Sequence, residues 1–283
     1  MFRQCRWARG VAKLATAIAL FGSPSAIAAE APKRVVSMNL CTDQLAMLLA
    51  GDGQLYSVSH LAKDETGSVL AKEAASFVTN HGQAEEIFLM KPDLILSGTY
   101  TTRATVDILK RLGFRVEEFQ PESSFDDIRF NIRRMGALLG REARAEELVH
   151  EMDATLASVP GRQADAPTVA LYYANQFTSG RGTLAGEVVN RAGLINLGEK
   201  LGLQGTQKLS LEQLVMAKPD LIAAHNAYAA PSLAYEAQVH PAFRAALSGK
   251  NLIDIPDKYW ICGAPFTAEA VKLLSDAAGR ANR

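Results

Sequence analysis

The sequence predicts an α/β protein of two Rossmann-like lobes, each with a mostly parallel sheet, joined by one long helix. A repeated motif is the first observation, because Glu85–Ser97 reads EEIFLMKPDLILS and Glu212–Ala224 reads EQLVMAKPDLIAA. The copies align without a gap at an offset of 127 residues, from Glu85 to Glu212, which suits two lobes of a duplicated architecture better than a solenoid. Strand and helix patterns also alternate in both halves, and a long helical tract separates them.

Each copy of the motif predicts a helix, a proline turn and a strand. Pro92 lacks an N–H and disfavours the αR conformation of Lys91, so the preceding helix is expected to end there. Leu94–Leu96 is a short run of Leu and Ile, typical of a central strand covered on both faces. The second copy predicts the same elements.

The first 28 residues are predicted to be a cleaved signal peptide. They contain Arg3, Arg6, Arg9 and Lys13 and no acidic residue, followed by the apolar stretch 14–21 and Ala-Ile-Ala at 26–28. This order is typical of secretory leaders, so we expect cleavage after residue 28 and export to the periplasm. The remaining chain has 26 basic residues (30 less 4) and 30 acidic ones, a balance that argues against a nucleic-acid partner.

The N-terminal lobe is predicted over residues 33–140. Gly51 and Gly113 follow two of its helices, at the C′ position where a helix often ends in the left-handed conformation. The polar segment 60–82 is expected to be a loop with a little helix. The predicted strands are Arg34–Met38, Leu55–Ser59, Leu94–Leu96 and Phe114–Phe119, and two further predicted helices are Asp43–Ala50 and Thr102–Leu112.

An interlobe helix is predicted over residues 141–160. Before it, Ser124 is placed to cap a helix that ends at Gly140 and carries Phe125 and Ile128 on its apolar face. The next helix runs from 141 to 159, where Pro-Gly stops it. At ~1.5 Å per residue it would be close to 30 Å long and would restrict the lobes to small relative motion.

The C-terminal lobe is predicted over residues 166–283. Its plan repeats that of the first, with a loop at 175–182 and another, rich in ring and thiol groups, at 257–265. The predicted strands are Thr168–Tyr173, the end of the second motif and Asn251–Ile255, and the predicted helices include Leu184–Ala192, Pro241–Leu247 and Phe266–Ala278.

Residues that follow the predicted strands are the candidate ligand-binding set, because ligands of open α/β sheets bind beyond the carboxyl ends of the strands. The set is rich in aromatics, has two arginines and has few carboxylates, which predicts a large, partly apolar and anionic ligand. Its members are Asn39, Cys41, His60, His81, Tyr100, Arg103, Phe177, Arg181, His225, Tyr228, Tyr259, Trp260 and Cys262.

The chain resembles the periplasmic binding proteins of ABC importers for ferric siderophores, haem and cobalamin. The markers, from about Arg34 to Leu274, are RVVSMN at the first strand, LMKPDLIL, FTSG at 177–180, the second AKPDLI and an aromatic loop before the last helix. The resemblance implies the class III periplasmic binding protein fold and a monomer without catalytic activity or cofactor. It also implies capture of a metal chelate, with a ferric siderophore favoured over cobalamin or haem.

The same resemblance implies a role for the repeated glutamates. In this family one exposed glutamate at the tip of each lobe docks onto arginines of the permease dimer in the inner membrane. Glu85 and Glu212 match those positions, and a carboxylate in the first turn of a helix is also favoured by the helix dipole. The alternative is that both are ordinary acids of a helix N-terminus.

A second hypothesis is transport of a free metal ion. Cys41 and Cys262 are the only cysteines beyond the leader, which contains Cys5, and they are expected to be free, to bind a metal or to form a disulfide. With His60 and His81 they would supply soft and borderline ligands, although no tight C-x-x-C or H-x-x-H spacing occurs. A disulfide is the least favoured expectation, because it would tie the lobes shut. Cys262 also stands about where the cobalamin-binding branch of the family has a basic residue.

The third hypothesis is an exported α/β enzyme. Gly180–Ala185 reads GRGTLA and matches the G-x-G-x-x-A dinucleotide fingerprint. The acid that should follow about 20 residues later is missing, and neither G-x-S-x-G nor H-E-x-x-H occurs. We therefore expect this loop to offer backbone N–H groups, or Arg181, to an anionic ligand.

Overall fold

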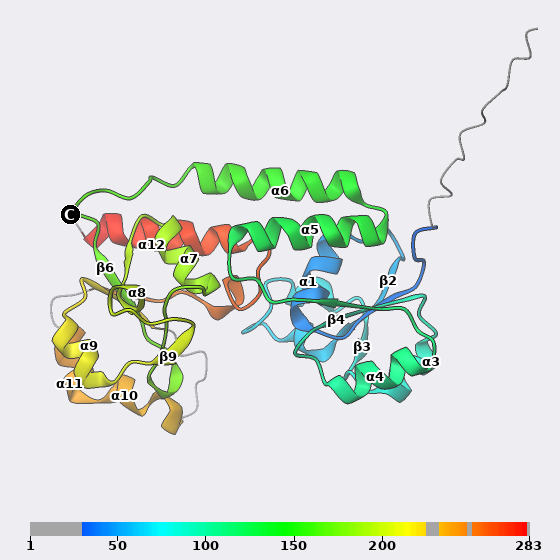
Figure 1. Ribbon diagram of the computed structural model, residues 1–283, viewed down its shortest axis with the longest axis horizontal. Coiled ribbons are helices and arrows are strands. Elements are labelled where there is room, and N and C mark those ends of the chain that lie inside the picture. Colours follow the sequence, from blue (N-terminus) through cyan, green and yellow to red (C-terminus); the bar gives the residue numbers. More distant parts are fainter. Residues whose placement is uncertain (1–29, 225–231, 248–250, 282–283) are drawn as a thin grey trace, which may run out of the picture. The chain divides into compact units, whose positions relative to one another are not determined.

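The computed structural model describes residues 30–224, 232–247 and 251–281. The described residues from 31 onward form one compact unit. It contains two parallel sheets with helices packed against them (Figure 1). Within the described ranges, no helix combines the length and apolar character needed to cross a bilayer.

The first sheet has five parallel strands in the order β3-β2-β1-β4-β5. The strand order reverses between β1 and β4, and the crevice at such a switch point is the usual ligand site of an open sheet. Alternate residues of the central strands face opposite sides, and both sides are buried, which explains their continuous apolar runs. The strands are β1 (Val35–Ser37), β2 (Leu55–Ser59), β3 (Val78–Asn80), β4 (Leu94–Gly98) and β5 (Val116–Phe119).

Helices cover both faces of this sheet. On one face Val35 and Leu94 pack with residues of α1 and α5, and on the other Val36 and Ile95 pack with residues of α3 and α4. Helix α1 begins three residues before the predicted start, because the side chain of Asn39 accepts a hydrogen bond from the Cys41 N–H and caps it. The helices are α1 (Leu40–Leu49), α2 (Ala71–Ala74), α3 (Ala84–Met90) and α4 (Arg103–Arg111), with a 3₁₀ turn at His60–Lys63.

The second sheet has four parallel strands in the order β11-β10-β6-β8. An antiparallel ribbon of β7 and β9 accompanies it, and β7 lies in the segment 175–182 that the sequence predicted to be a loop. The two chain segments of the ribbon lie close together just beyond β7, because a Cβ on Gly180 would lie 2.2 Å from the carbonyl oxygen of Leu203. The strands are β6 (Thr168–Leu171), β7 (Phe177–Ser179), β8 (Ile195–Asn196), β9 (Thr206–Lys208), β10 (Leu221–Ala223) and β11 (Asn251–Ile253).

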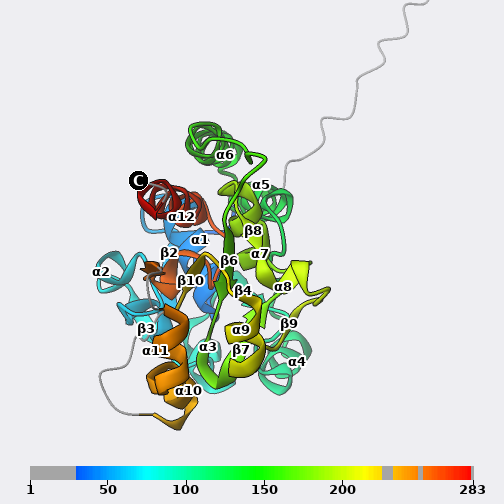
Figure 2. The same ribbon diagram turned by 90° about the vertical axis from the view of Figure 1, so that its left-hand side faces the viewer.

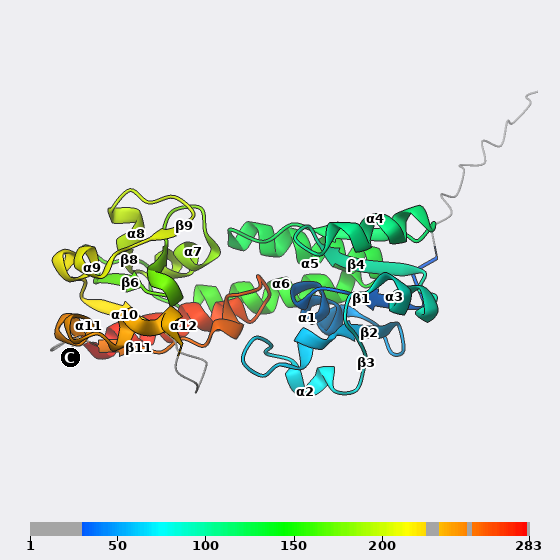
Figure 3. The same ribbon diagram turned by 90° about the horizontal axis from the view of Figure 1, so that it is seen from below.

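The helices of the second half include a long final one, α12, which packs against α7 and β11 (Figure 3). Short 3₁₀ turns at Ala174–Gln176, Leu233–Tyr235 and Asp257–Tyr259 connect the other elements. The helices are α7 (Leu184–Arg191), α8 (Leu197–Lys200), α9 (Leu211–Ala217), α10 (Glu236–Val239), α11 (Pro241–Leu247) and α12 (Thr267–Ala281).

The repeated Lys-Pro-Asp has the same structure in both halves. Lys91 (φ 51°, ψ 54°) and Lys218 (φ 46°, ψ 55°) both adopt the left-handed conformation that ends the helix, so the predicted helix ends are confirmed. The Asp93 carboxylate accepts hydrogen bonds from the backbone N–H groups of Lys33 (2.6 Å) and Arg34 (2.9 Å). Asp220 does the same for Thr168 (2.8 Å). Each aspartate therefore fixes the backbone that enters the first strand of its sheet.

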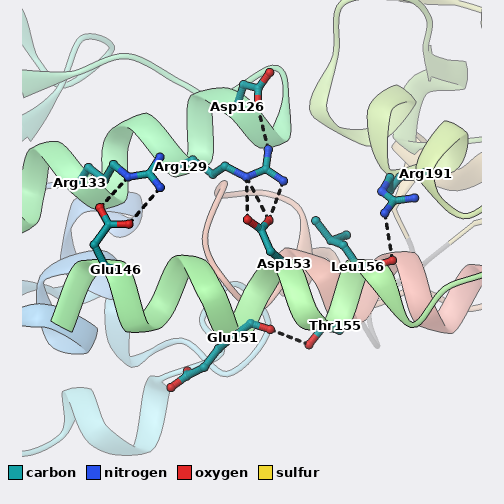
Figure 4. Close-up of polar contacts among 9 residues, drawn as sticks. All are labelled: Asp126, Arg129, Arg133, Glu146, Glu151, Asp153, Thr155, Leu156 and Arg191. Carbon is teal, nitrogen blue, oxygen red and sulfur yellow. Dashed lines mark hydrogen bonds and ion pairs between the residues drawn. The ribbon is translucent and has the colours of Figure 1, made fainter. Parts of the chain in front are cut away.

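Helix α6 (Glu142–Ala157) packs against α5 (Phe125–Leu139) and α12 (Figure 2). Figure 4 shows its polar contacts: Arg129 of α5 forms a two-pronged ion pair with Asp153, and Arg191 of α7 donates to the carbonyl oxygen of Leu156 (3.0 Å). Helix α6 thus contacts helices of both halves, and the predicted fold class is confirmed. The predicted lobe boundaries stay predictions.

Candidate functional site

A cavity of about 520 Å³ lies where the carboxyl ends of the strands of both sheets meet. Its wall comes from the segments after β1, β4 and β5 on one side and after β6, β7 and β11 on the other. Parallel strands bring their carboxyl ends to one edge of a sheet, so these distant segments converge. The lining residues are Asn39, Cys41, Thr42, Gly98, Thr99, Tyr100, Phe119, Gln120, Pro121, Glu122, Tyr173, Ser179, Thr183, Leu184, Ala185, Thr206, Asp257, Trp260, Ile261 and Gly263.

Four residues of the sequence-based candidate set line this cavity: Asn39, Cys41, Tyr100 and Trp260. Tyr100 is 87% exposed, whereas Trp260 is half-buried against the core. Arg103 lines an adjoining hollow that shares Tyr100 with the main cavity.

Other members of the candidate set lie outside the cavity wall. His60 and His81 stack on each other at a ring-centroid distance of 5.2 Å, and His81 Nδ1 lies 2.9 Å from a carboxylate oxygen of Glu86. Both imidazoles are exposed. Phe177 packs under the Lys208 ammonium, Arg181 is exposed, and Tyr259 packs against the core. His225 and Tyr228 lie outside the described residues.

Cys41 and Cys262 form a disulfide across a sequence separation of 221 residues. The expectation that ranked this bond last is therefore wrong. Its premise fails because a cavity is present beside the bond: Cys41 is part of the wall, and the buried Cys262 stands in the sequence between the wall residues Ile261 and Gly263. Disulfide sulfurs are not the thiolates that bind metal ions, so the metal-ligand role is corrected for both cysteines. Among the described residues, no group of three His, Cys, Asp or Glu side chains is arranged to hold a metal ion.

Glu122 is a wall residue that the sequence-based candidate set omitted. One carboxylate oxygen accepts a hydrogen bond from Asn131 Nδ2 (2.5 Å), and the other accepts from the Gly263 N–H (3.1 Å). A Cβ on Gly263 would lie 2.5 Å from Glu122 Cβ, so the close contact requires glycine. Burial raises the pKa of the Glu122 carboxyl, and the Asn131 hydrogen bond opposes that shift. Glu122 and the disulfide thus join the first half of the chain to two adjacent residues of the second half, Gly263 and Cys262.

The wall combines four aromatic rings with two carboxylates and, among the described residues, no Lys, Arg or His. The rings are Tyr100, Phe119, Tyr173 and Trp260. The second carboxylate, Asp257, lies near the Trp260 indole, at 3.4 Å from Oδ1 to Nε1. Burial raises the pKa of Tyr173, so its phenol stays protonated.

Neither arginine of the candidate set lines the main cavity. The backbone of Arg181 is instead hydrogen-bonded to Leu203 and Gly205, and its side chain is exposed. The dinucleotide-like loop has a local role, because Thr183 caps α7 by accepting from the Gly186 N–H and donates to the Gly180 carbonyl. The wall therefore gives no support to the predicted anionic ligand.

The sequence of this chain is similar to those of known binding proteins. A family model described as periplasmic binding protein matches residues 35–240. Cobalamin-binding proteins of two Halobacterium salinarum strains are 26% identical over 201 residues, which is 68% of this chain and 53% of theirs. The match therefore spans about half the length of these relatives.

Solved structures show the same fold at low identity. The periplasmic haem-binding protein RhuT from Roseiflexus sp. RS-1 superposes with a TM-score of 0.70 at 21% identity, covering 89% of this chain and 99% of that one. The haem-binding protein BhuT with two haems has a TM-score of 0.73 at 18% identity, with coverages of 89% and 99%. The vitamin B12 binding protein BtuF of Vibrio cholerae has a TM-score of 0.64 at 20% identity, with coverages of 89% and 98%.

Proposed function

The chain belongs to the periplasmic binding protein family, and on that premise we propose that it captures a metal chelate in the periplasm and delivers it to the permease of an ABC importer. The observation that carries the proposal is the cavity built from the strand ends of both sheets. It offers aromatic faces from each half and a few polar groups, the usual composition of a site for a small organic ligand. The chain has the class III periplasmic binding protein fold, which relatives that bind haem and vitamin B12 share.

The chelate is proposed to lie between Tyr100 on one side of the cavity and Trp260 on the other. Flat aromatic faces suit a planar macrocycle or the apolar shell of a siderophore, because stacking adds to the burial of apolar area. A free-ion carrier is disfavoured, because the disulfide removes the two thiol ligands on which that hypothesis depended. The family and its structural neighbours are solute-binding proteins, which favours transport over catalysis.

Titration with chelates should quench tryptophan fluorescence. The chain has two tryptophans, at positions 7 and 260, so protein lacking residues 1–28 reports on Trp260 alone. We expect saturable quenching with at least one of cyanocobalamin, haem or a ferric siderophore, and none with zinc or iron salts. By calorimetry, Trp260→Ala should weaken binding about tenfold, or ~1.4 kcal/mol. Tyr259→Phe, outside the wall, should leave the affinity unchanged. Quenching by simple salts alone would contradict the proposal.

Permease docking is proposed for Glu85 and Glu212. Both are exposed, and both lie in the first turn of the helix that opens each repeat, α3 and α9. Ser210 and Gln213 form a capping box at the start of α9. Hydrogen bonds from the backbone of Glu212 itself and from Ser210 lower the pKa of the Glu212 carboxyl. That carboxyl is therefore ionised at neutral pH and suited to pair with a cation on a partner.

The Glu85→Ala/Glu212→Ala double variant should bind chelate like wild type but lose most stimulation of its permease. The measurement is ATP hydrolysis or chelate uptake by the permease reconstituted in liposomes. Glu142→Ala is a matched control, because Glu142 is an exposed acid in the first turn of α6, outside both repeats. Full uptake with the double variant would show that these carboxylates are ordinary helix-start residues.

A further inference from the structure

Resting on the proposed function, we infer that the chelate bound in this cavity carries no net negative charge and presents hydrogen-bond donors to the wall. Corrin rings with peripheral amides and neutral hydroxamate chelates have this chemistry. Haem, with two propionates, and ferric tris-catecholates, with three negative charges, do not.

The charged side chains of the described wall are both acidic. Glu122 and Asp257 both line the cavity, and the described residues add no Lys, Arg or His to it. An anionic ligand would leave water for a partly apolar space that already holds two carboxyl groups. Like charges in a site of low dielectric repel each other strongly, so such a ligand would bind weakly or force Glu122 to take up a proton.

Glu122 cannot easily turn away from a ligand, because its position is fixed from two sides. Asn131 holds one oxygen and the Gly263 N–H holds the other. Asn131 is itself buried and also donates to the carbonyl oxygen of Gln120. A carboxylate has about four acceptor sites in total, so each oxygen keeps capacity for a donor from the ligand. The carboxylate is therefore placed to accept a hydrogen bond from an amide N–H or a hydroxyl O–H of the ligand.

Two helix N-termini partly offset these charges without reversing them. The starts of α1 and α7 contribute Asn39, Cys41, Thr42 and residues 183–185 to the wall. Each helix start carries roughly half a unit of positive charge. Both ends are already capped, since Asn39 accepts from the Cys41 N–H and Thr183 from the Gly186 N–H. The helix ends therefore reduce the negative potential of the cavity, which favours a neutral ligand, but they do not supply a full positive charge.

Arg103 is a candidate cation that lies outside the main cavity wall. Arg103 lines the adjoining hollow, and Glu118 lies in the wall of that same hollow. Glu118 also pairs with Lys110. Arg103 is exposed, so its charge is screened by water and does not compensate a buried anion in the main cavity.

A charge-graded ligand series tests the inference. The probes are cyanocobalamin and ferrichrome, which are neutral, and haem and ferric enterobactin, which are anionic, each titrated against Trp260 fluorescence at fixed ionic strength. At least one neutral probe should bind at least tenfold more tightly than both anionic probes. Glu122→Gln, which keeps one acceptor oxygen, should shift the ratio of haem to neutral-probe affinity at least fivefold toward haem. Glu118→Gln, outside the main cavity wall, should leave that ratio unchanged.

The outcomes of the ligand series distinguish a wrong ligand charge from a wrong proposed function. If haem or ferric enterobactin binds more tightly than both neutral probes, the inference is wrong and the chelate-carrier function stands. An unchanged ratio in a folded Glu122→Gln variant overturns the role given to Glu122, and circular dichroism and thermal melting establish that the variant is folded. If none of the four probes binds, the failure lies with the proposed function itself.

Discussion

Replacing Cys41 and Cys262 together with serine should lower the free energy of unfolding by on the order of 5 kcal/mol. The bond closes a loop across 221 residues of sequence separation. Without the bond the unfolded chain has much more conformational entropy, and this entropy is lost on folding. Urea unfolding of wild type and of the double variant under oxidising conditions gives the difference from the midpoint and slope of each transition; the slope of the variant should be steeper, because its unfolded chain is less compact.

Reduced wild type is the internal control for the disulfide. In dithiothreitol it should unfold close to the midpoint of the double variant, and reductant should not affect the variant itself. A double variant within about 1 kcal/mol of oxidised wild type would mean that contacts such as Glu122 with Gly263 hold the two halves without covalent help.

The second large effect is expected from Asp43→Asn, which should stabilise the protein at pH 7.5 by up to about 3 kcal/mol. Asp43 is fully buried in α1, where one carboxylate oxygen accepts from the backbone N–H and hydroxyl of Ser59. Burial raises its pKa from 3.8 to about 6, with the Ser59 hydrogen bonds opposing the shift. The folded state therefore binds the proton more tightly than the unfolded state, and keeping the carboxylate ionised in the interior costs free energy.

The sign of the pH dependence follows from this raised pKa. Below about pH 4 Asp43 is protonated in both states and contributes no penalty, and as pH rises from about 4 to 6 the wild type loses stability, with the full penalty above that range. Asparagine does not titrate, so the gain of Asp43→Asn should appear only as pH rises through this window. Urea unfolding at several pH values measures it.

Asp127→Asn is the control of opposite sign. A backbone N–H from Ser123 lowers the pKa of Asp127 at the start of α5, so its carboxylate stabilises the fold above its unfolded pKa. The asparagine variant should therefore lose stability at pH 7.5. An Asp43→Asn variant whose stability declines with pH as steeply as wild type would contradict the role given to Asp43.

Elements with strong local signals could be predicted from the sequence. Ser124 caps α5 as expected, by accepting from the Asp127 N–H, and Gly140 ends that helix in the left-handed conformation. Both Lys-Pro-Asp turns also end their helices where proline requires it. Strands β3 and β9 could not be predicted in this way, because they are short, and polar or exposed at most positions. Their partners in the folded chain, β2 and β7, make them strands.

The candidate site could be predicted only in outline. The rule that ligand groups follow strand ends identified Asn39, Tyr100 and Trp260, which line the cavity. Glu122 was omitted because it occurs in a polar Pro-Glu-Ser-Ser stretch that reads as the exposed start of a helix. Its burial depends on Gly263, far along the chain, and the pairing of the two cysteines depends on the same tertiary contact. No local pattern encodes a contact between the two halves.

We propose that one chelate lies in the cavity between the strand ends of the two sheets. A crystal structure of the mature chain, grown with the tightest-binding probe of the ligand series, tests this most directly. We expect density for one chelate in contact with Tyr100, Glu122 and Trp260. A chelate bound instead at Phe177 and Arg181, with this cavity empty, would contradict it.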